Sequence, residues 1–158
     1  ENSAAMEPGL VELQDGSVLM IIRTNLGHIY QAVSADRGET WSKAEAMELV
    51  APASPATITR IPTTGDLFIV WNNNPKGSKA NWQERTPLTC AISKDEGKTW
   101  EKAKNLENDP NSGYAYTSIT WIDHKAYLTY YHWKQGQPNF YLTDLRLSMI
   151  PTNWFYRN

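Results

Sequence analysis

The chain has 158 residues, which is enough for one domain with a sizeable hydrophobic core. Its formal net charge is -2, and its lysines and arginines are scattered without a basic run, which argues against a nucleic-acid-binding protein. The single cysteine, Cys90, excludes an internal disulfide, and no apolar stretch reaches the ~18 residues of a membrane-spanning helix, so we expect no membrane span.

Short apolar runs separated by turn residues recur along the chain, and helical periodicity is nearly absent. This pattern is typical of an all-β protein. The first two runs flank Asp15-Gly16, a dipeptide that favours a tight hairpin between them. Cys90 lies inside a later apolar run, so we interpret it as a buried, inert thiol. The first group of expected strands covers residues 11–13, 17–23, 27–34 and 46–50.

The same pattern then restarts twice. The second group of expected strands covers 56–61, 67–71 and 86–93, and the third covers 114–122, 125–131 and 139–149. The polar segment 72–85, with its Pro and Gly, is expected to be a long loop. Four-stranded units in series indicate a β-propeller. We therefore predict an all-β fold that forms a partial β-propeller of about three four-stranded blades, at roughly 1–52, 53–108 and 109–158.

Two octets with the pattern Ser-x-Asp-x-Gly-x-Thr-Trp follow the third strand of the first two units. They are SADRGETW (Ser34–Trp41) and SKDEGKTW (Ser93–Trp100). In such a turn Asp36 can accept hydrogen bonds from turn amides, and Gly38 can adopt positive φ at low cost. Trp41 can pack beneath the turn with a partner for its N–H. We expect both octets to be structural corners between strands, since a carboxylate held in a turn is poorly placed for chemistry.

Both octets resemble the Asp-box, or bacterial neuraminidase repeat, of sialidases and related six-bladed propellers. Three longer segments are similar to the sialidase segments that carry active-site residues: MEPGLVELQDGSVLMIIRT (Met6–Thr24), ERTPLTCAISKDEGKTW (Glu84–Trp100) and SGYAYTSITWIDHKAYLTYY (Ser112–Tyr131). Because three units cannot close a six-membered ring, the resemblance implies the C-terminal portion of a larger protein. We expect the 158-residue chain to be inactive by itself, since it would supply half of a propeller site and leave strand edges open.

The resemblance implies that Tyr116 is the catalytic nucleophile and Glu7 its base. Sialidases use a tyrosine because a neutral phenol is not repelled by the carboxylate of sialic acid. A phenol with a pKa near ~10 needs an adjacent base to attack at neutral pH. Tyr114 is the rival nucleophile or a binding residue, because it lies two positions earlier and would share a strand face with Tyr116 if the strand were regular.

The resemblance also implies that Arg23 and Arg85 bind the substrate carboxylate through bidentate, charge-assisted hydrogen bonds. Trp82 lies in the long polar loop beside Arg85 and is expected to stack on sugar, a role also open to two other tryptophans near loops, Trp71 and Trp133. Arg60 precedes a hairpin turn and is interpreted as structural. The three histidines are His28, His124 and His132. They lack metal-ligand spacing and are interpreted as surface or turn residues, so we expect no metal. We also expect no cofactor.

The resulting hypothesis is an exo-acting, retaining, sialidase-like glycoside hydrolase that removes terminal sialic or related acidic sugars from glycans. Two alternatives stay open: a non-catalytic Asp-box propeller that binds glycan or protein, and a propeller hydrolase of a different glycoside. The family's acid/base Asp and first Arg belong to its N-terminal half, and Tyr130-Tyr131 stands where an acidic residue is frequent. A secreted or periplasmic location follows from the resemblance alone, and the oligomeric state is left open.

Overall fold

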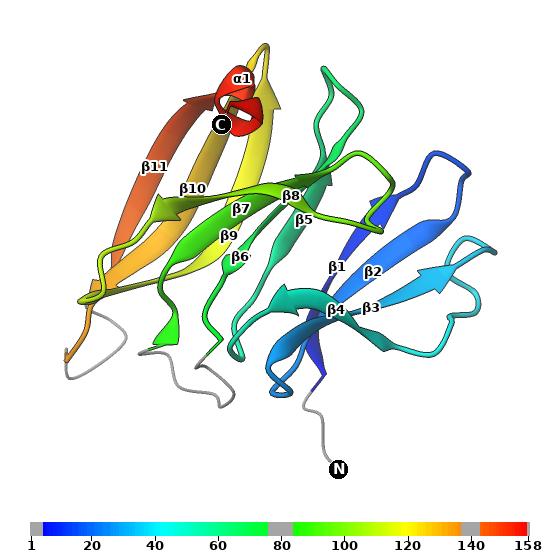
Figure 1. Ribbon diagram of the computed structural model, residues 1–158, viewed down its shortest axis with the longest axis horizontal. Coiled ribbons are helices and arrows are strands. Elements are labelled where there is room, and N and C mark those ends of the chain that lie inside the picture. Colours follow the sequence, from blue (N-terminus) through cyan, green and yellow to red (C-terminus); the bar gives the residue numbers. More distant parts are fainter. Residues whose placement is uncertain (1–4, 76–83, 137–142, 158) are drawn as a thin grey trace.

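The computed structural model describes residues 5–75, 84–136 and 143–157, and these form three antiparallel sheets in chain order (Figure 1). The first sheet contains β1 (Met6–Glu12), β2 (Val18–Arg23), β3 (His28–Ser34) and β4 (Glu45–Val50). The second contains β5 (Thr57–Arg60), β6 (Leu67–Asn72), β7 (Leu88–Ser93) and β8 (Glu101–Glu107). The third contains β9 (Ser112–Ile122), β10 (Lys125–Lys134) and β11 (Asp144–Pro151). A short helix, α1 (Thr152–Tyr156), follows β11.

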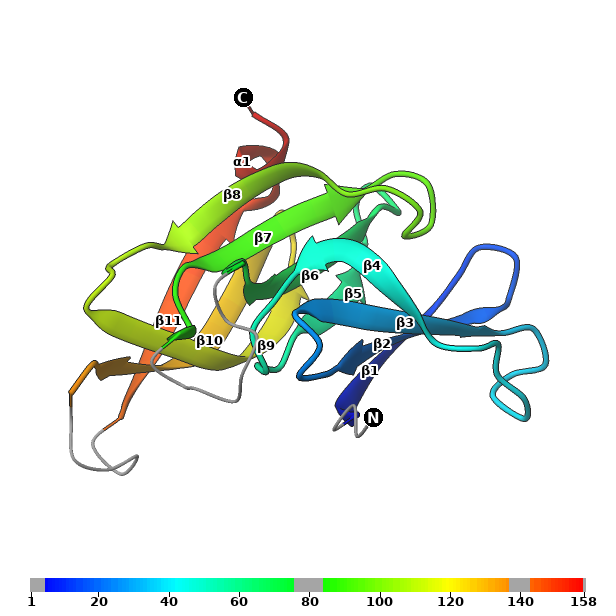
Figure 2. The same ribbon diagram turned by 60° about the horizontal axis from the view of Figure 1, so that its bottom comes forward.

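The predicted all-β, partial propeller fold is confirmed. Within each four-stranded sheet the strands lie in chain order, as the repeat predicts, and the three sheets do not close into a ring (Figure 2). The third sheet has three strands in the described part of the chain, in the order β11-β10-β9. Part of the strand expected at 139–149 lies outside the described residues, and residues 144–149 belong to β11. The sequence did not predict α1.

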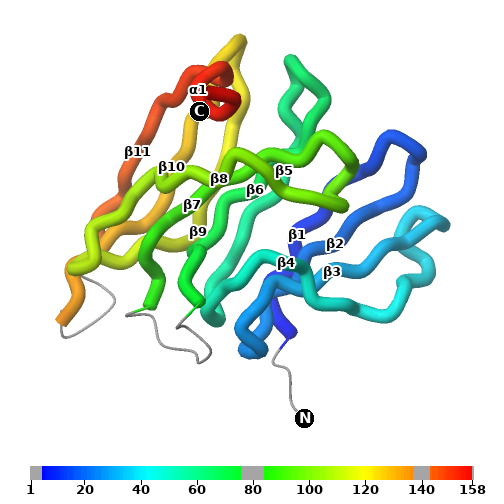
Figure 3. The backbone as a smooth tube through the Cα atoms, viewed as in Figure 1, coloured from blue at the N-terminus to red at the C-terminus, as the bar shows by residue number. Residues whose placement is uncertain are grey.

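The first strands of the three sheets lie next to one another, because β5 contacts both β1 and β9. The hairpins that join first and second strands all point to the same end, which is uppermost in Figure 3. The chain enters β1 at the opposite end. Residues at the beginning of β1 and at the end of β2 therefore share an end of the molecule that lies away from the hairpins.

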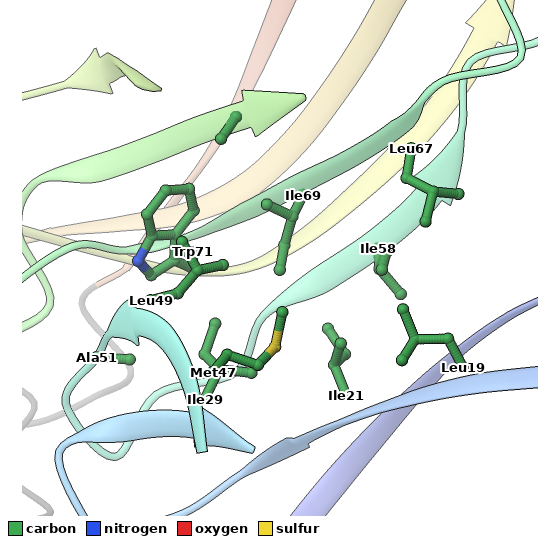
Figure 4. Packing of buried hydrophobic residues seen from close by; sticks show 11 residues of the cluster. Leu19, Ile21, Ile29, Met47, Leu49, Ala51, Ile58, Leu67, Ile69 and Trp71 are labelled. Carbon is green, nitrogen blue, oxygen red and sulfur yellow. The ribbon is translucent and has the colours of Figure 1, made fainter. Parts of the chain in front are cut away.

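The hydrophobic core consists of two clusters separated by the second sheet. Leu67, Ile69 and Trp71 of β6 pack against the first sheet (Figure 4), whereas Phe68 and Val70 pack against the third. Successive side chains of a strand point to opposite faces, so a strand buried on both faces is an unbroken apolar run. The sequence Leu67–Trp71 is such a run, which explains why the second sheet is the central layer.

Cys90 of β7 belongs to the same central layer. It is buried in the cluster between the second and third sheets. Burial raises the pKa of its thiol to about 12, so the side chain stays protonated at neutral pH. The predicted burial of Cys90 in the core is confirmed.

The helix α1 covers one end of the core between the second and third sheets. Phe155 is buried and contacts Phe68, with 4.6 Å between ring centroids. The Tyr156 hydroxyl donates to Asp66 Oδ2 at 2.6 Å, and Lys104 Nζ donates to the carbonyl of Trp154 at 2.6 Å. A five-residue helix has little intrinsic stability, so these contacts with the second sheet hold it.

The two octets form the same hydrogen-bonded corner. In the first, Asp36 Oδ1 accepts from the amide of Thr40 at 2.8 Å, Asp36 Oδ2 accepts from Thr40 Oγ1 at 2.6 Å, and Ser34 Oγ accepts from the amide of Gly38 at 2.8 Å. Ser93, Asp95, Gly97 and Thr99 repeat these bonds at 2.6–2.9 Å. Both glycines have positive φ. The structural role of the octets is confirmed.

The tryptophans that close the octets differ. Trp41 Nε1 donates to the carbonyl of Gly38 at 3.1 Å, as predicted. The Nε1 of Trp100, by contrast, is buried without a hydrogen-bond partner in the described part of the chain. Trp100 instead packs against the core cluster between the first and second sheets, and its backbone N–H donates to Glu48 Oε1 at 3.2 Å. The apolar ring of Trp100 therefore contributes more to the corner than its N–H does.

The second octet also joins the first and second sheets. Glu96 accepts from both terminal nitrogens of Arg60 at 2.8 Å and from the amide of Gln14 at 2.8 Å. Arg60 donates further to the carbonyls of Glu12 and Gly65. These bonds use both terminal nitrogens of Arg60, in agreement with its interpretation as a structural residue.

We predict that the octets make stability depend on acid pH. Hydrogen bonds from Thr40 lower the pKa of Asp36 to about 2, and those from Thr99 lower the pKa of Asp95 to about 2. Because these folded-state values lie below the unfolded value of ~3.9, the stabilisation is complete above about pH 4 and is lost as the pH falls toward 2. Urea unfolding midpoints at pH 7, 4 and 2.5 measure this loss.

The control is the double variant Asp36→Asn/Asp95→Asn. It should be less stable than the parent at pH 7, and its midpoint should fall less between pH 4 and pH 2.5. Equal losses in the parent and the double variant would contradict the assignment of acid sensitivity to these two carboxylates.

Candidate active site

The fold brings together Glu7 and Tyr116, which are 109 positions apart in the sequence. Tyr116 in β9 donates its hydroxyl to Glu7 Oε1 in β1 at 3.1 Å. The two strands belong to the first and third sheets, and β5 lies between them. A phenol hydrogen-bonded to a carboxylate is the arrangement in which a base can take the phenolic proton.

Both residues occupy the same kind of backbone irregularity. In β1, Met6 pairs with Arg23 and Gly9 with Ile21, so Glu7 and Pro8 together face Ile22. In β9, Ala115 pairs with Tyr131 and Ser118 with Thr129, so Tyr116 and Thr117 together face Tyr130. Two residues opposite one define a β-bulge, which turns a side chain away from its regular direction.

The first residue of each bulge has a left-handed backbone. Glu7 has a φ of 46° and Tyr116 a φ of 58°, a region that favours glycine. Such residues cost about 1–3 kcal/mol each and persist only where surrounding structure imposes them. Lys102 in β8 also has positive φ, at 57°, so the conformation alone does not define a site. The hydrogen bond between two such residues is what distinguishes Glu7 and Tyr116.

Arg23 binds the second oxygen of Glu7. Its Nη1 donates to Glu7 Oε2 at 2.7 Å, and its side chain is nearly buried. The Glu7 carboxylate therefore accepts one hydrogen bond from the phenol and one from a guanidinium. Arg23 Nε is buried without a hydrogen-bond partner. The ion pair fixes the direction of the carboxylate toward Tyr116.

Arg85 approaches Tyr116 from the segment that precedes β7. The guanidinium carbon lies 5.8 Å from the centre of the Tyr116 ring, and the side chain is only 8% exposed. Burial lowers the pKa of Arg85, and the neighbouring positive charge of Arg23 lowers it further. Within the described residues Arg85 has no ion pair, and its Nη2 donates to the carbonyl of Ala53 at a long 3.4 Å. Two guanidiniums beside one phenol form a site suited to an anion.

Tyr114 lies on the other side of β9 from Tyr116. It is 1% exposed and packs in the core against Tyr130 and His132, with ring centroids 6.2 and 5.5 Å away. The bulge at Tyr116 changes the alternation of the strand, so that Ile119 and Trp121, rather than residues 118 and 120, continue the buried face of Tyr114. Burial raises the pKa of Tyr114. The structure therefore does not bring Tyr114 together with Glu7.

Three predictions about aromatic and histidine residues are corrected here. Trp71 and Trp133 lie near strand ends, as expected, but both are buried and so are not available to stack on sugar. Trp71 Nε1 donates to the carbonyl of Val50 at 3.1 Å. His132 was expected at the surface or in a turn, but it is 4% exposed in β10, with Nε2 3.1 Å from Ser112 Oγ. The predicted site residue Trp82 lies outside the described residues.

One residue beside Tyr116 was not predicted as part of the site. Tyr131 in β10 is partly exposed, and its ring centroid lies 5.9 Å from that of Tyr116 in an edge-to-face arrangement. Tyr116 is thus flanked by Arg85 and Tyr131. In the sequence, Tyr131 stands out only because it replaces an acidic residue. Its contact with Tyr116 was not predictable, because cross-strand neighbours depend on the strand register, which the bulge shifts.

The described residues contain no group of three or more His, Cys, Asp or Glu side chains that could hold a metal ion. In the same ranges, no helix is long and apolar enough to cross a bilayer. The functional groups that the structure brings together are the phenol of Tyr116, the carboxylate of Glu7 and the guanidiniums of Arg23 and Arg85.

Two successive sheets carry Asp-box corners, and a Tyr–Glu pair on the inner strands β1 and β9 lies beside two arginines. These features define an Asp-box β-propeller protein of the sialidase-like class. A family model described as a BNR repeat-like domain matches residues 1–130, and the chain belongs to that family. The sialidases of two strains of Vibrio cholerae are 30% identical over 132 residues, which cover 74% of this chain and 16% of theirs. The chain spans about one sixth of the length of these curated relatives.

Solved structures confirm the fold. An intramolecular trans-sialidase from Ruminococcus gnavus, in complex with oseltamivir carboxylate, superimposes with a TM-score of 0.74 over 99% of this chain and 34% of that protein, at 21% identity. An α-L-arabinofuranosidase from Fusarium graminearum, bound to an iminosugar inhibitor, gives a TM-score of 0.64 over 94% of this chain and 45% of that protein, at 15% identity. The chain therefore shares its fold with enzymes named for different sugars.

Proposed function

We propose that this chain contributes the nucleophile, its base and two substrate-binding arginines to an exo-acting, retaining, sialidase-like glycoside hydrolase. The substrate would be a glycan that ends in sialic acid or a related acidic sugar. The observation that carries this proposal is the 3.1 Å hydrogen bond from the Tyr116 hydroxyl to Glu7 Oε1. The rest of the site would come from a longer protein that carries this chain, called the parent below.

In the first step the Tyr116 oxygen attacks the anomeric carbon, and the phenolic proton passes to Glu7. The bond between the anomeric carbon and the leaving-group oxygen breaks, and that oxygen takes a proton from an acid elsewhere in the parent. In the second step water attacks the same carbon and gives a proton to the conjugate base of that acid, the tyrosyl–carbon bond breaks, and Glu7 returns its proton to the Tyr116 oxygen. Two displacements at one carbon leave its configuration unchanged.

Charge supports an acidic substrate. Arg85 is buried beside Tyr116 without an ion pair in the described part of the chain, so a substrate carboxylate would supply the missing negative charge. Arg23 is already paired with Glu7 but keeps a buried, unpartnered Nε. Binding an anion between guanidinium groups is favourable in a site of low exposure, where charge-assisted hydrogen bonds are strong.

The direct test is hydrolysis of a fluorogenic sialoside by the parent, with the first-formed anomer of the released sugar followed by proton NMR. Turnover with retained configuration supports the proposal. An inverted product would contradict a tyrosyl intermediate.

A second candidate is a hydrolase of another glycoside, favoured by the shared fold with an arabinofuranosidase. A panel that contains a sialoside, a uronide and an α-L-arabinofuranoside separates the two, because the buried Arg85 favours the acidic sugars. A non-catalytic propeller is a third outcome, since Asp-box corners stabilise sheets whatever the protein does. Glycan binding without turnover of any panel member would indicate that outcome.

A further inference from the structure

The bulge that carries Tyr116 is held by a hydroxyl from the neighbouring sheet. Thr57 Oγ1 in β5 donates to the carbonyl of Thr117 at 2.6 Å. Thr117 is the second residue of the bulge, directly after Tyr116. A bulge leaves its extra residue without a partner in the strand ladder, and buried backbone carbonyls need one. Thr57 supplies that partner from the strand that lies between β1 and β9.

The second sheet and the segment that precedes β7 also bind the backbone before Tyr116. The amide of Tyr114 donates to the carbonyl of Arg85 at 2.9 Å, and Asn72 Nδ2 donates to the carbonyl of Tyr114 at 3.2 Å. Asn72 is fully buried, so its amide is fixed in place. The left-handed residue Tyr116 thus lies between two backbone segments that the second sheet holds, one on each side.

The side chain of Tyr116 cannot fix its own conformation. It is 44% exposed, and a tyrosine has no intrinsic preference for a φ of 58°. Strained backbone of this kind persists only when its surroundings impose it. Of the ties described above, the Thr57 hydroxyl is the one that acts on the bulge itself.

We propose that Thr57 is a positioning residue for Tyr116: its hydroxyl holds the Thr117 carbonyl and so keeps the phenol directed at Glu7. This inference rests on the proposed function for its effect on catalysis. Its structural part, the conformation of Tyr116, does not depend on which reaction the parent performs.

The test compares three variants of the parent. Thr57→Val removes the hydroxyl at nearly constant volume, Thr57→Ser keeps it, and Thr59→Val is the matched control two residues along the same strand. Thr59 Oγ1 makes only a 3.5 Å contact with the carbonyl of Arg60, so its loss should not reach the site. Urea unfolding identifies conditions in which every variant is folded.

Thr57→Val should lower kcat about 10- to 100-fold, because a small displacement of a reacting group is enough for such a loss. KM should change less than about threefold, since the arginines that bind substrate are untouched and only the positioning of the nucleophile is altered. Thr57→Ser should recover most of kcat, and Thr59→Val should resemble the parent. A merely structural role would lower stability without this split between kcat and KM.

Crystal structures of the parent and of Thr57→Val give a readout besides activity. In Thr57→Val we expect Tyr116 to leave the left-handed region and its hydroxyl to lose the bond to Glu7. If the parent hydrolyses no glycoside, the proposed function fails while this comparison still decides the role of Thr57. The inference is overturned if Thr57→Val keeps the parental conformation of Tyr116, keeps the parental kcat when folded, or is not rescued by Thr57→Ser.

Discussion

Replacing Tyr116 by phenylalanine is expected to lower kcat/KM of the parent at least about 10³-fold, because the variant has no oxygen to attack the anomeric carbon. The ring, its contact with Tyr131 and the left-handed backbone are all retained, so stability should change little. The measurement is hydrolysis of the fluorogenic sialoside under first-order conditions, together with a urea unfolding curve for each protein.

Glu7→Gln tests the base in the same pair. Removing a general base typically costs 10²- to 10⁴-fold, and we expect a loss in that range. Because the proton that Glu7 accepts comes from Tyr116, the double variant Tyr116→Phe/Glu7→Gln should be no slower than Tyr116→Phe by more than about threefold. Additive losses would show that the two residues do not act as a unit.

Tyr127→Phe is the control for removal of a phenolic oxygen, since Tyr127 lies in β10 and belongs to none of the contacts of the site. It should keep the parental rate. If Tyr116→Phe were as active as Tyr127→Phe, the nucleophile would be another group and the assignment of Tyr116 would be wrong.

Gly113→Ala is expected to destabilise the chain by about 3 kcal/mol, at the upper end of typical overpacking costs. A methyl group at this position would overlap the indole of Trp133 and lie 2.6 Å from its Nε1. Trp133 is buried in β10, directly across the strand pair from Gly113, so the ring cannot move aside. Urea unfolding followed by tryptophan fluorescence gives the change in the free energy of unfolding.

Two comparisons isolate the contact with Trp133. Gly16→Ala places a methyl group in open space at a residue with positive φ, so it should cost only about 1–2 kcal/mol of backbone strain. The double variant Gly113→Ala/Trp133→Leu should be less unstable than the sum of its two single changes, because the smaller side chain removes the overlap. Simple additivity would place the cost of Gly113→Ala elsewhere.

Local sequence was sufficient for much of the fold. A hairpin turn, two Asp-box corners and a buried strand were each predicted from a short segment: Asp15-Gly16, the two octets and the apolar run Leu67–Trp71. Such features depend on neighbours within a few residues. The short helix α1 was not predictable in this way, since it is held by contacts of Phe155 and Tyr156 with distant residues.

The pairing of Glu7 with Tyr116 was suggested by resemblance, but only the tertiary structure decided which tyrosine reaches the carboxylate. Regular alternation would place Tyr114 and Tyr116 on one face of β9, and the bulge places them on opposite faces. The same limit applies to His132 and Trp133, whose burial depends on packing between sheets. The sequence by itself determined the turns, the strands and the corners of this protein. The direction of the Tyr116 side chain was decided by the tertiary structure. A tyrosine with positive φ opposes its own backbone preference. It persists where hydrogen bonds from another sheet, such as the one from Thr57, hold the neighbouring peptide groups.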